Sequence, residues 1–127
     1  MVSEIYTGPD RRRVSRIKYE GPAQVAGKGH DGIMHSELCS FVNLSENGCC
    51  VKAPIGFNDG VELSITFKLP GLLNIFVRST VKVIWCTLYP MERCYLLGLA
   101  FGQLNSYDLT AVRSFIMTEV RNQKEIP

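Results

Sequence analysis

Four arginines lie within six residues near the start of the chain, in the stretch DRRRVSR at residues 10–16. A guanidinium group is a planar fork of donors that suits phosphate oxygens and the Hoogsteen edge of guanine, and it can also stack on a base. The chain as a whole has a formal net charge of only +2, so this positive charge is a local feature. An isolated arginine run is usually a solvated basic segment. This cluster, however, is also suited to a ligand that carries phosphates.

The second stretch with chemical potential is NLSENG, at residues 43–48. Asn43 offers an amide that can pair with the edge of a base, and Ser45 offers a hydroxyl. Gly48 allows either a backbone with positive φ or the close approach of a ligand to the main chain. Taken alone, the stretch is equally typical of a plain β-turn, because Asn, Ser and Gly are common turn residues.

The elements that position these residues are predicted to be mainly strands, because polarity alternates with period two along much of the chain. The clearest example is VELSITFKL at 61–69, and the same alternation at 77–85 places Trp85 in the core. Turn residues separate the alternating segments. Six short strands joined by turns predict an all-β fold, either a small antiparallel barrel or a sandwich. The remaining four strands are predicted at 22–28, 35–43, 48–54 and 95–101.

The end of the chain changes to a helical period. We predict one helix at about 106–122, capped by Asn105 or Ser106, with Asp108 in its first turn. Its apolar stripe is expected to close one end of the barrel or to pack on its side. This stripe comprises Leu109, Val112, Ile116 and Val120, with Phe115 beside it.

Other classes of chemistry find little support in the sequence. The chain shows no export signal and no apolar run long enough to span a bilayer, so we expect a cytoplasmic protein with reduced thiols and no membrane insertion. The spacing of the cysteines and histidines matches no standard zinc site, so we expect no metal. No positioned nucleophile, carboxylate pair or Gly-rich phosphate loop is visible, so we expect no enzymatic activity. The five cysteines are Cys39, Cys49, Cys50, Cys86 and Cys94.

In combination, the two polar stretches resemble the PilZ domain family. The carrying residues are the pair Arg12 and Arg16, four positions apart, followed by Asn43, Ser45 and Gly48 with the spacing Asn-x-Ser-x-x-Gly. The resemblance implies a six-stranded antiparallel β-barrel with a C-terminal α-helix. It also implies that the barrel binds cyclic di-GMP. Arg12 and Arg16 would then contact phosphates and guanine, Asn43 would pair with a guanine edge, and Ser45 and Gly48 would complete the site.

The resemblance extends over nearly the whole chain, because Gly98, Leu99 and Phe101 match the family's last strand. It divides the chain into a flexible N-terminal arm at 1–20, a barrel at 21–104, and a C-terminal helix and tail at 105–127. In the family, the residue just before the arginine pair influences how many ligands bind. Arg11 in this position favours an intercalated pair of cyclic di-GMP molecules, whereas Arg13 is expected to contribute only charge.

The function implied is that of a receptor without a catalytic domain. Ligand binding would change the conformation of the arm and so regulate an unidentified effector protein in motility, chemotaxis, biofilm formation or exopolysaccharide synthesis, and we expect a monomer. One alternative is a PilZ-like interaction module that does not bind the nucleotide, although such relatives lack the residues kept here. Another is a nucleic-acid-binding barrel, which we do not expect because the basic residues are confined to one segment and most aromatics fall on apolar strand faces.

Overall fold

The computed structural model describes residues 16–71 and 75–125, and Arg11, Arg12 and Arg13 lie outside these ranges. Within them the chain forms seven strands, one short 3-10 helix and one α-helix. Each of the six predicted strands matches an observed strand to within a few residues. The elements are β1 (Arg16–Lys18), β2 (Pro22–Lys28), β3 (Met34–Ser45), β4 (Gly48–Ala53), β5 (Glu62–Leu69), β6 (Ile75–Tyr89), η1 (Pro90–Glu92), β7 (Cys94–Phe101) and α1 (Ser106–Glu125).

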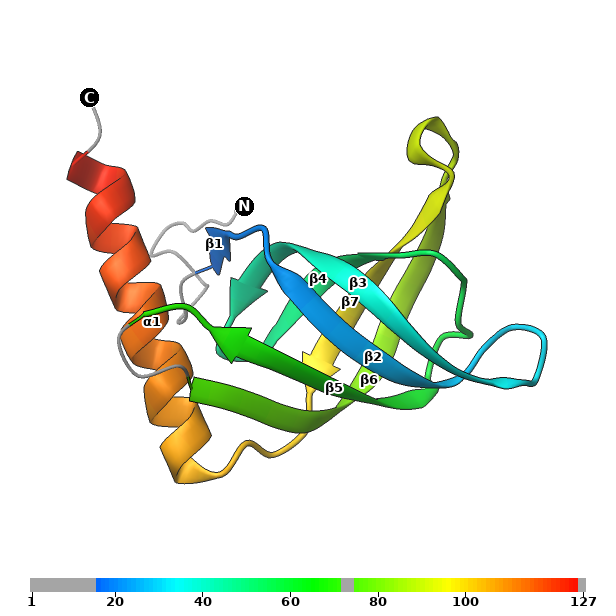
Figure 1. The fold of residues 1–127 in the computed structure, drawn as a ribbon, viewed down its shortest axis with the longest axis horizontal. Coiled ribbons are helices and arrows are strands. Elements are labelled where there is room, and N and C mark those ends of the chain that lie inside the picture. Colours follow the sequence, from blue (N-terminus) through cyan, green and yellow to red (C-terminus); the bar gives the residue numbers. More distant parts are fainter. Residues whose placement is uncertain (1–15, 72–74, 126–127) are drawn as a thin grey trace, which may run out of the picture.

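Six of these strands close into an antiparallel barrel, with α1 at one end (Figure 1). Its strand order is β3-β2-β5-β6-β7-β4, and β4 pairs back to β3 to close the ring. The predicted all-β fold, a six-stranded antiparallel barrel with a C-terminal helix, is therefore confirmed. The additional strand β1 pairs with β3 outside the ring. Its three residues belong to the segment 1–20 that the sequence assigned to the arm.

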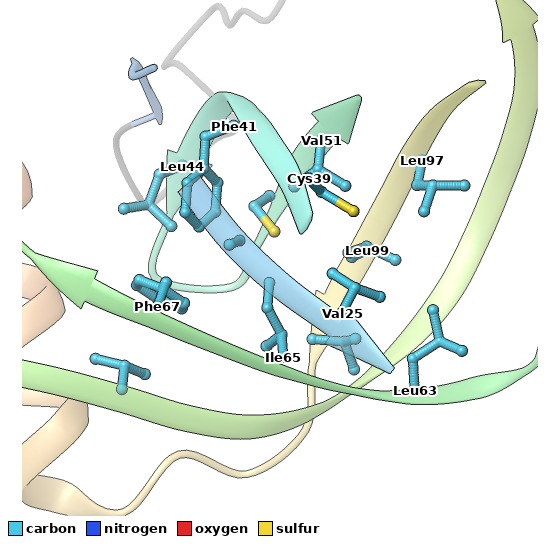
Figure 2. Close-up of a cluster of buried hydrophobic side chains, with 14 of the residues drawn as sticks. Val25, Cys39, Phe41, Leu44, Val51, Leu63, Ile65, Phe67, Leu97 and Leu99 are labelled. Atoms are coloured by element: carbon cyan, nitrogen blue, oxygen red, sulfur yellow. The ribbon is translucent and has the colours of Figure 1, made fainter. Parts of the chain in front are cut away.

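The core lies inside the barrel, where alternate residues of the strands point inward (Figure 2). Val25, Phe41, Val51, Ile65 and Leu97 come from five different strands and are each at most 1% exposed. Full burial of one such side chain stabilises the fold by about 1.5–3 kcal/mol. The inward residues of all strands therefore hold the ring closed and leave its outer surface available to polar residues.

Helix α1 closes one end of the barrel, as predicted. Asn105 caps its first turn, because the Asn105 side-chain oxygen accepts a hydrogen bond of 2.7 Å from the backbone N–H of Asp108. Val112 and Ile116 are buried, and the Phe115 ring lies 5.2 Å from the ring of Tyr19. No helix within the described ranges is both long and apolar enough to cross a membrane.

The prediction that Trp85 belongs to the core was wrong. A β-bulge lies in β6, because Val83 pairs with Leu99 and Trp85 pairs with the adjacent Gly98, so that Ile84 is an extra residue. The extra residue reverses the alternation, so Trp85 faces outward and is 41% exposed. Beyond the bulge, β6 and β7 continue as a hairpin that projects from the barrel (Figure 1).

Candidate ligand-binding surface

The pairing of β1 with β3 brings one end of the arginine segment to the second polar stretch. Arg16 lies opposite Ser45 and Lys18 lies opposite Asn43, with antiparallel register. Between them, Ile17 is 2% exposed and pairs with the buried Leu44, so an apolar contact anchors β1 on the barrel. The exposed Arg16 side chain is consequently held beside the stretch that begins at Asn43.

Within the described part of the chain, Asn43 has a hydrogen-bonding group without a partner. Its side-chain oxygen is buried, and it has no hydrogen-bond partner among the described residues. A buried acceptor without a partner costs about 1–3 kcal/mol, so such groups mark either strain or a partner that is absent. A ligand that supplied an N–H donor to this oxygen would remove that cost.

Ser45 organises the turn between β3 and β4. It is 2% exposed, and its hydroxyl oxygen accepts hydrogen bonds from the backbone N–H groups of Asn47 and Gly48, both at 3.2 Å. The hydroxyl also donates to the carbonyl oxygen of Gly48 at 3.3 Å. The serine therefore fixes the shape of the turn, in agreement with the β-turn that its residue type also indicated.

Gly48 is required by the barrel itself. A Cβ atom at this position would overlap the carbonyl oxygen of Leu99 on the neighbouring strand β7. Positive φ values occur elsewhere in the described chain, and Gly48 is not among them. The positive φ that the sequence allowed for this glycine is therefore not used, and Gly48 is required because the β7 backbone lies close to it. The expected close approach of a ligand stays a prediction.

The turn is also tied to the helix. Glu46 accepts two hydrogen bonds from Arg113 of α1, from Nε at 2.8 Å and from a terminal guanidinium nitrogen at 3.0 Å. The side chains are 20% and 54% exposed respectively. The hydrogen bonds and the positive charge of Arg113 lower the pKa of the Glu46 carboxyl. The positive charge of Arg113 thus offsets part of the negative charge of the carboxylate and reduces its repulsion of an anion.

A row of residues crosses the outer surface beside the turn. Strand register aligns Lys18, Asn43, Cys50, Gly98 and Trp85 on five neighbouring strands. Strands lie about 4.8 Å apart, so the distance from Asn43 to Gly98 across the sheet is about 10 Å. The Trp85 indole covers Gly98, because a Cβ atom at Gly98 would overlap the indole ring. The sequence does not predict this row of residues, since the row depends on the bulge and on register between distant strands.

Positive charge lies at both ends of the surface. Arg16 and Lys18 are exposed on β1 at one side. On the other side Lys82 of β6 is exposed, and it pairs with Ala100 of β7, which in turn pairs with Gly48 of β4. Burial raises the pKa of the Cys50 thiol, and the nearby positive charge of Arg16 partly opposes this rise. The surface therefore combines basic groups, an amide oxygen that no described residue pairs with, and an exposed indole, a set that suits an anionic ligand with aromatic bases.

Metal and thiol chemistry are not evident in this part of the chain. The described residues contain no group of three or more His, Cys, Asp or Glu side chains that could hold a metal ion. All five cysteines are free thiols, and burial raises the pKa of Cys39 to about 12. Buried protonated thiols are poor nucleophiles and poor metal ligands.

Comparison with known proteins identifies the architecture. The model of the PilZ domain matches residues 10–118, which is most of the chain. No curated protein gives a significant match. The solved structure of the Bacillus subtilis inhibitor of motility MotI (DgrA) superposes with a TM-score of 0.72 and 17% identity, over 92% of this chain and 54% of that one. This chain thus spans about half the length of that relative.

Two further structures were solved with a ligand. The PilZ domain of YcgR from Escherichia coli, with c-di-GMP, gives a TM-score of 0.64 at 16% identity, over 91% of this chain and 95% of that one. MrkH of K. pneumonia, in complex with c-di-GMP, gives a TM-score of 0.59 at 15% identity, over 92% of this chain and 56% of that one. At such low identities, these likenesses concern the fold.

Proposed function

Because the chain belongs to the PilZ domain family, we propose that it is a receptor for cyclic di-GMP that binds the ligand on the outer surface beside β1 and the β3–β4 turn. The observation that carries the proposal is the buried side-chain oxygen of Asn43, which has no partner among the described residues and lies next to Lys18 and Arg16 in strand register. Relatives of the same fold, YcgR and MrkH, were solved with this ligand.

The chemistry of the ligand fits the residues of the surface. Guanine presents N–H donors on one edge, and the Asn43 oxygen accepts from such a donor. Guanine N7 and O6 and the phosphate oxygens accept hydrogen bonds, and arginine forks donate them. Arg16 supplies one fork, and Arg12, which lies outside the described residues, supplies a second. Ser45 and Gly48 shape the turn that presents Asn43 to the ligand.

Arg11 bears on how many ligand molecules bind to each chain. We infer that it stacks on an additional guanine, so that two intercalated cyclic di-GMP molecules bind to each chain. An arginine plane over a base face is a favourable arrangement. Arg11 lies outside the described residues, so this inference depends on its place before the arginine pair and is tested by stoichiometry.

The output of the receptor is proposed to be a change at the arm. Since Arg16 pairs with β3 while Arg11 and Arg12 lie four to five positions before it, ligand binding draws the segment before β1 toward the turn. The new surface then regulates an effector protein, with no catalytic activity of the chain's own. Ligand shifts this equilibrium only by the difference in its affinity for the two arm positions.

Calorimetric titration with cyclic di-GMP tests the binding. Arg12→Ala, Arg16→Ala and Asn43→Leu should each weaken binding by about tenfold or more, as expected for loss of a contact to a base or phosphate worth about 1–3 kcal/mol. Asn43→Asp keeps the acceptor and should retain most of the affinity. Arg78→Ala is the matched control, because Arg78 is an exposed arginine on β6 outside the proposed site. Trp85, the single tryptophan, gives an independent fluorescence signal.

Two results would contradict the proposal. Absence of binding to the wild-type chain would leave the PilZ-like interaction module as the better description. Equal weakening by Arg78→Ala and Arg16→Ala would mean that binding is only a matter of net charge. A stoichiometry of two that falls to one in Arg11→Ala supports the stacked pair, whereas one ligand per wild-type chain would rule it out. Slower hydrogen exchange in residues 1–20 on binding tests the change at the arm.

A further inference from the structure

The second half of β6 has an open edge. Strand β5 pairs with β6 from Ile75 to Lys82, and the loop before β5 extends this pairing through Val83, whose N–H donates to Val61 and whose carbonyl accepts from Gly60. Beyond the bulge residue Ile84, β6 pairs with β7 on one side from Trp85 to Tyr89. Among the described residues no strand pairs with the other side. Alternate N–H and C=O groups along these five residues therefore point away from the sheet.

Apart from the β-bulge at its start, this edge lacks the features that normally protect an open strand. Natural edges carry charged residues, especially lysine, or prolines or bulges that prevent pairing with another chain. The segment from Ile84 to Tyr89 contains no charged residue and no proline. Ile84, Trp85 and Leu88 are 53%, 41% and 54% exposed. The hairpin also projects from the barrel, so a second strand can approach it (Figure 1).

We propose that this edge pairs with the same edge of a second copy of the chain, forming a two-fold symmetric dimer. Antiparallel pairing of identical strands is self-complementary, and an uncharged edge meets its copy without like-charge repulsion. Residues opposite each other across an antiparallel pair share a face, so the two-fold axis passes through a residue rather than between two. An axis through Cys86 places Trp85 opposite Thr87, while the bulge residue Ile84 lies at the end of the paired segment.

The size of the contact determines how strong this dimer is. A fully covered large aromatic buries about 150–250 Å², so three half-exposed apolar side chains contribute on the order of 300 Å² per copy. The paired backbone adds to this, but the total stays below the roughly 800 Å² per partner of a standard stable interface. Association is therefore weak, with a dissociation constant above about 1 µM, and depends on concentration.

Sedimentation velocity of the full chain, without nucleotide, tests the proposal over about 1 µM to 1 mM. The wild-type mass should rise with concentration from 14.2 kDa toward twice that value. Thr87→Lys and Leu88→Lys place a charge on the edge and should weaken association by at least tenfold. Met117→Lys is the matched control, because it adds the same charge at an exposed apolar residue on α1, and it should associate like the wild type.

Hydrogen exchange on the wild-type chain supplies a readout that does not depend on how the variants fold. Exchange of the amides at 84–89 should slow as protein concentration rises, while exchange in β2 should not change. A wild-type chain that stays monomeric throughout the range would overturn the dimer and leave the edge to a strand of a different protein. Association that persists in both edge variants would place the contact elsewhere and would equally overturn it.

Discussion

Gly48 should tolerate no larger residue, although its backbone angles are ordinary for a strand. A Cβ atom added there would overlap the Leu99 carbonyl oxygen and lie 3.1 Å from the Ala100 Cα atom. Both atoms belong to the backbone of β7, which is held between β4 and β6 in the closed ring. Neither can move without breaking a ladder of hydrogen bonds. Gly48→Ala is therefore an overpacking substitution against a rigid neighbour.

The expected loss of stability in Gly48→Ala can be compared with that in Gly98→Ala, a second glycine substitution on the same sheet. Overpacking costs about 1–3 kcal/mol, and the loss of glycine's freedom in the unfolded chain returns about 0.4–1 kcal/mol. We expect Gly48→Ala to lower the free energy of unfolding by about 1–2 kcal/mol. At Gly98 the added Cβ atom meets the Trp85 indole, which is partly exposed and able to rotate away. Gly98→Ala should therefore change stability by less than about 1 kcal/mol.

Thermal and urea unfolding of both variants measures this difference. For a domain of this size, 1 kcal/mol corresponds to about 3–5 °C in Tm, so Gly48→Ala should melt about 3–10 °C below the wild type. Gly98→Ala should melt close to the wild type but shift the Trp85 fluorescence to longer wavelength, because the displaced indole meets more water. Equal losses of stability in the two variants would refute the reasoning, and so would a Gly48→Ala variant as stable as the wild type.

Three further predictions concern charge and thiols. Glu46→Gln removes the ion pair with the half-exposed Arg113 and should cost about 0.2–1 kcal/mol in urea unfolding; a loss that does not shrink in high salt would contradict this. Hydrogen bonds that the His35 ring donates to the carboxylates of Asp31 and Glu37 raise the pKa of His35, so its stabilising contribution is complete below about pH 6.5 and lost as pH rises through the raised pKa. His35→Gln should remove that part of the dependence of Tm on pH, and an unchanged profile would count against it. Iodoacetamide should modify the partly exposed Cys86 in the native chain before the buried Cys39, as peptide mass spectrometry would show; early labelling of Cys39 would contradict its burial.

The strands were predictable because their alternation follows directly from having one face in the core, as in β5, where Leu63, Ile65 and Phe67 are buried. Strand β1 was missed because three residues carry no period. Trp85 was misplaced because one inserted residue at a bulge reverses the faces without any mark in local composition.

The candidate site divides in the same way. The residue types at Asn43, Ser45 and Gly48 indicated a polar turn near a basic segment, but their individual roles depend on contacts between distant strands. The hydroxyl of Ser45 forms hydrogen bonds within the turn. Gly48 is required because the backbone of Leu99, about fifty residues later in the chain, lies against it. Local sequence does not specify such register, so only the folded barrel reveals why a serine and a glycine stand there.

The ion pair between Glu46 and Arg113 has a consequence for communication through the molecule. It joins residues 67 positions apart, one inside the polar turn and the other on an exposed face of α1. A protein that grips α1 and withdraws Arg113 would release the turn, and a ligand that repositions the turn would change how Arg113 is presented. By thermodynamic linkage the two effects are equal in free energy. A partner bound to the helix would thus set the affinity for a ligand at the turn as strongly as the ligand sets the affinity for the partner.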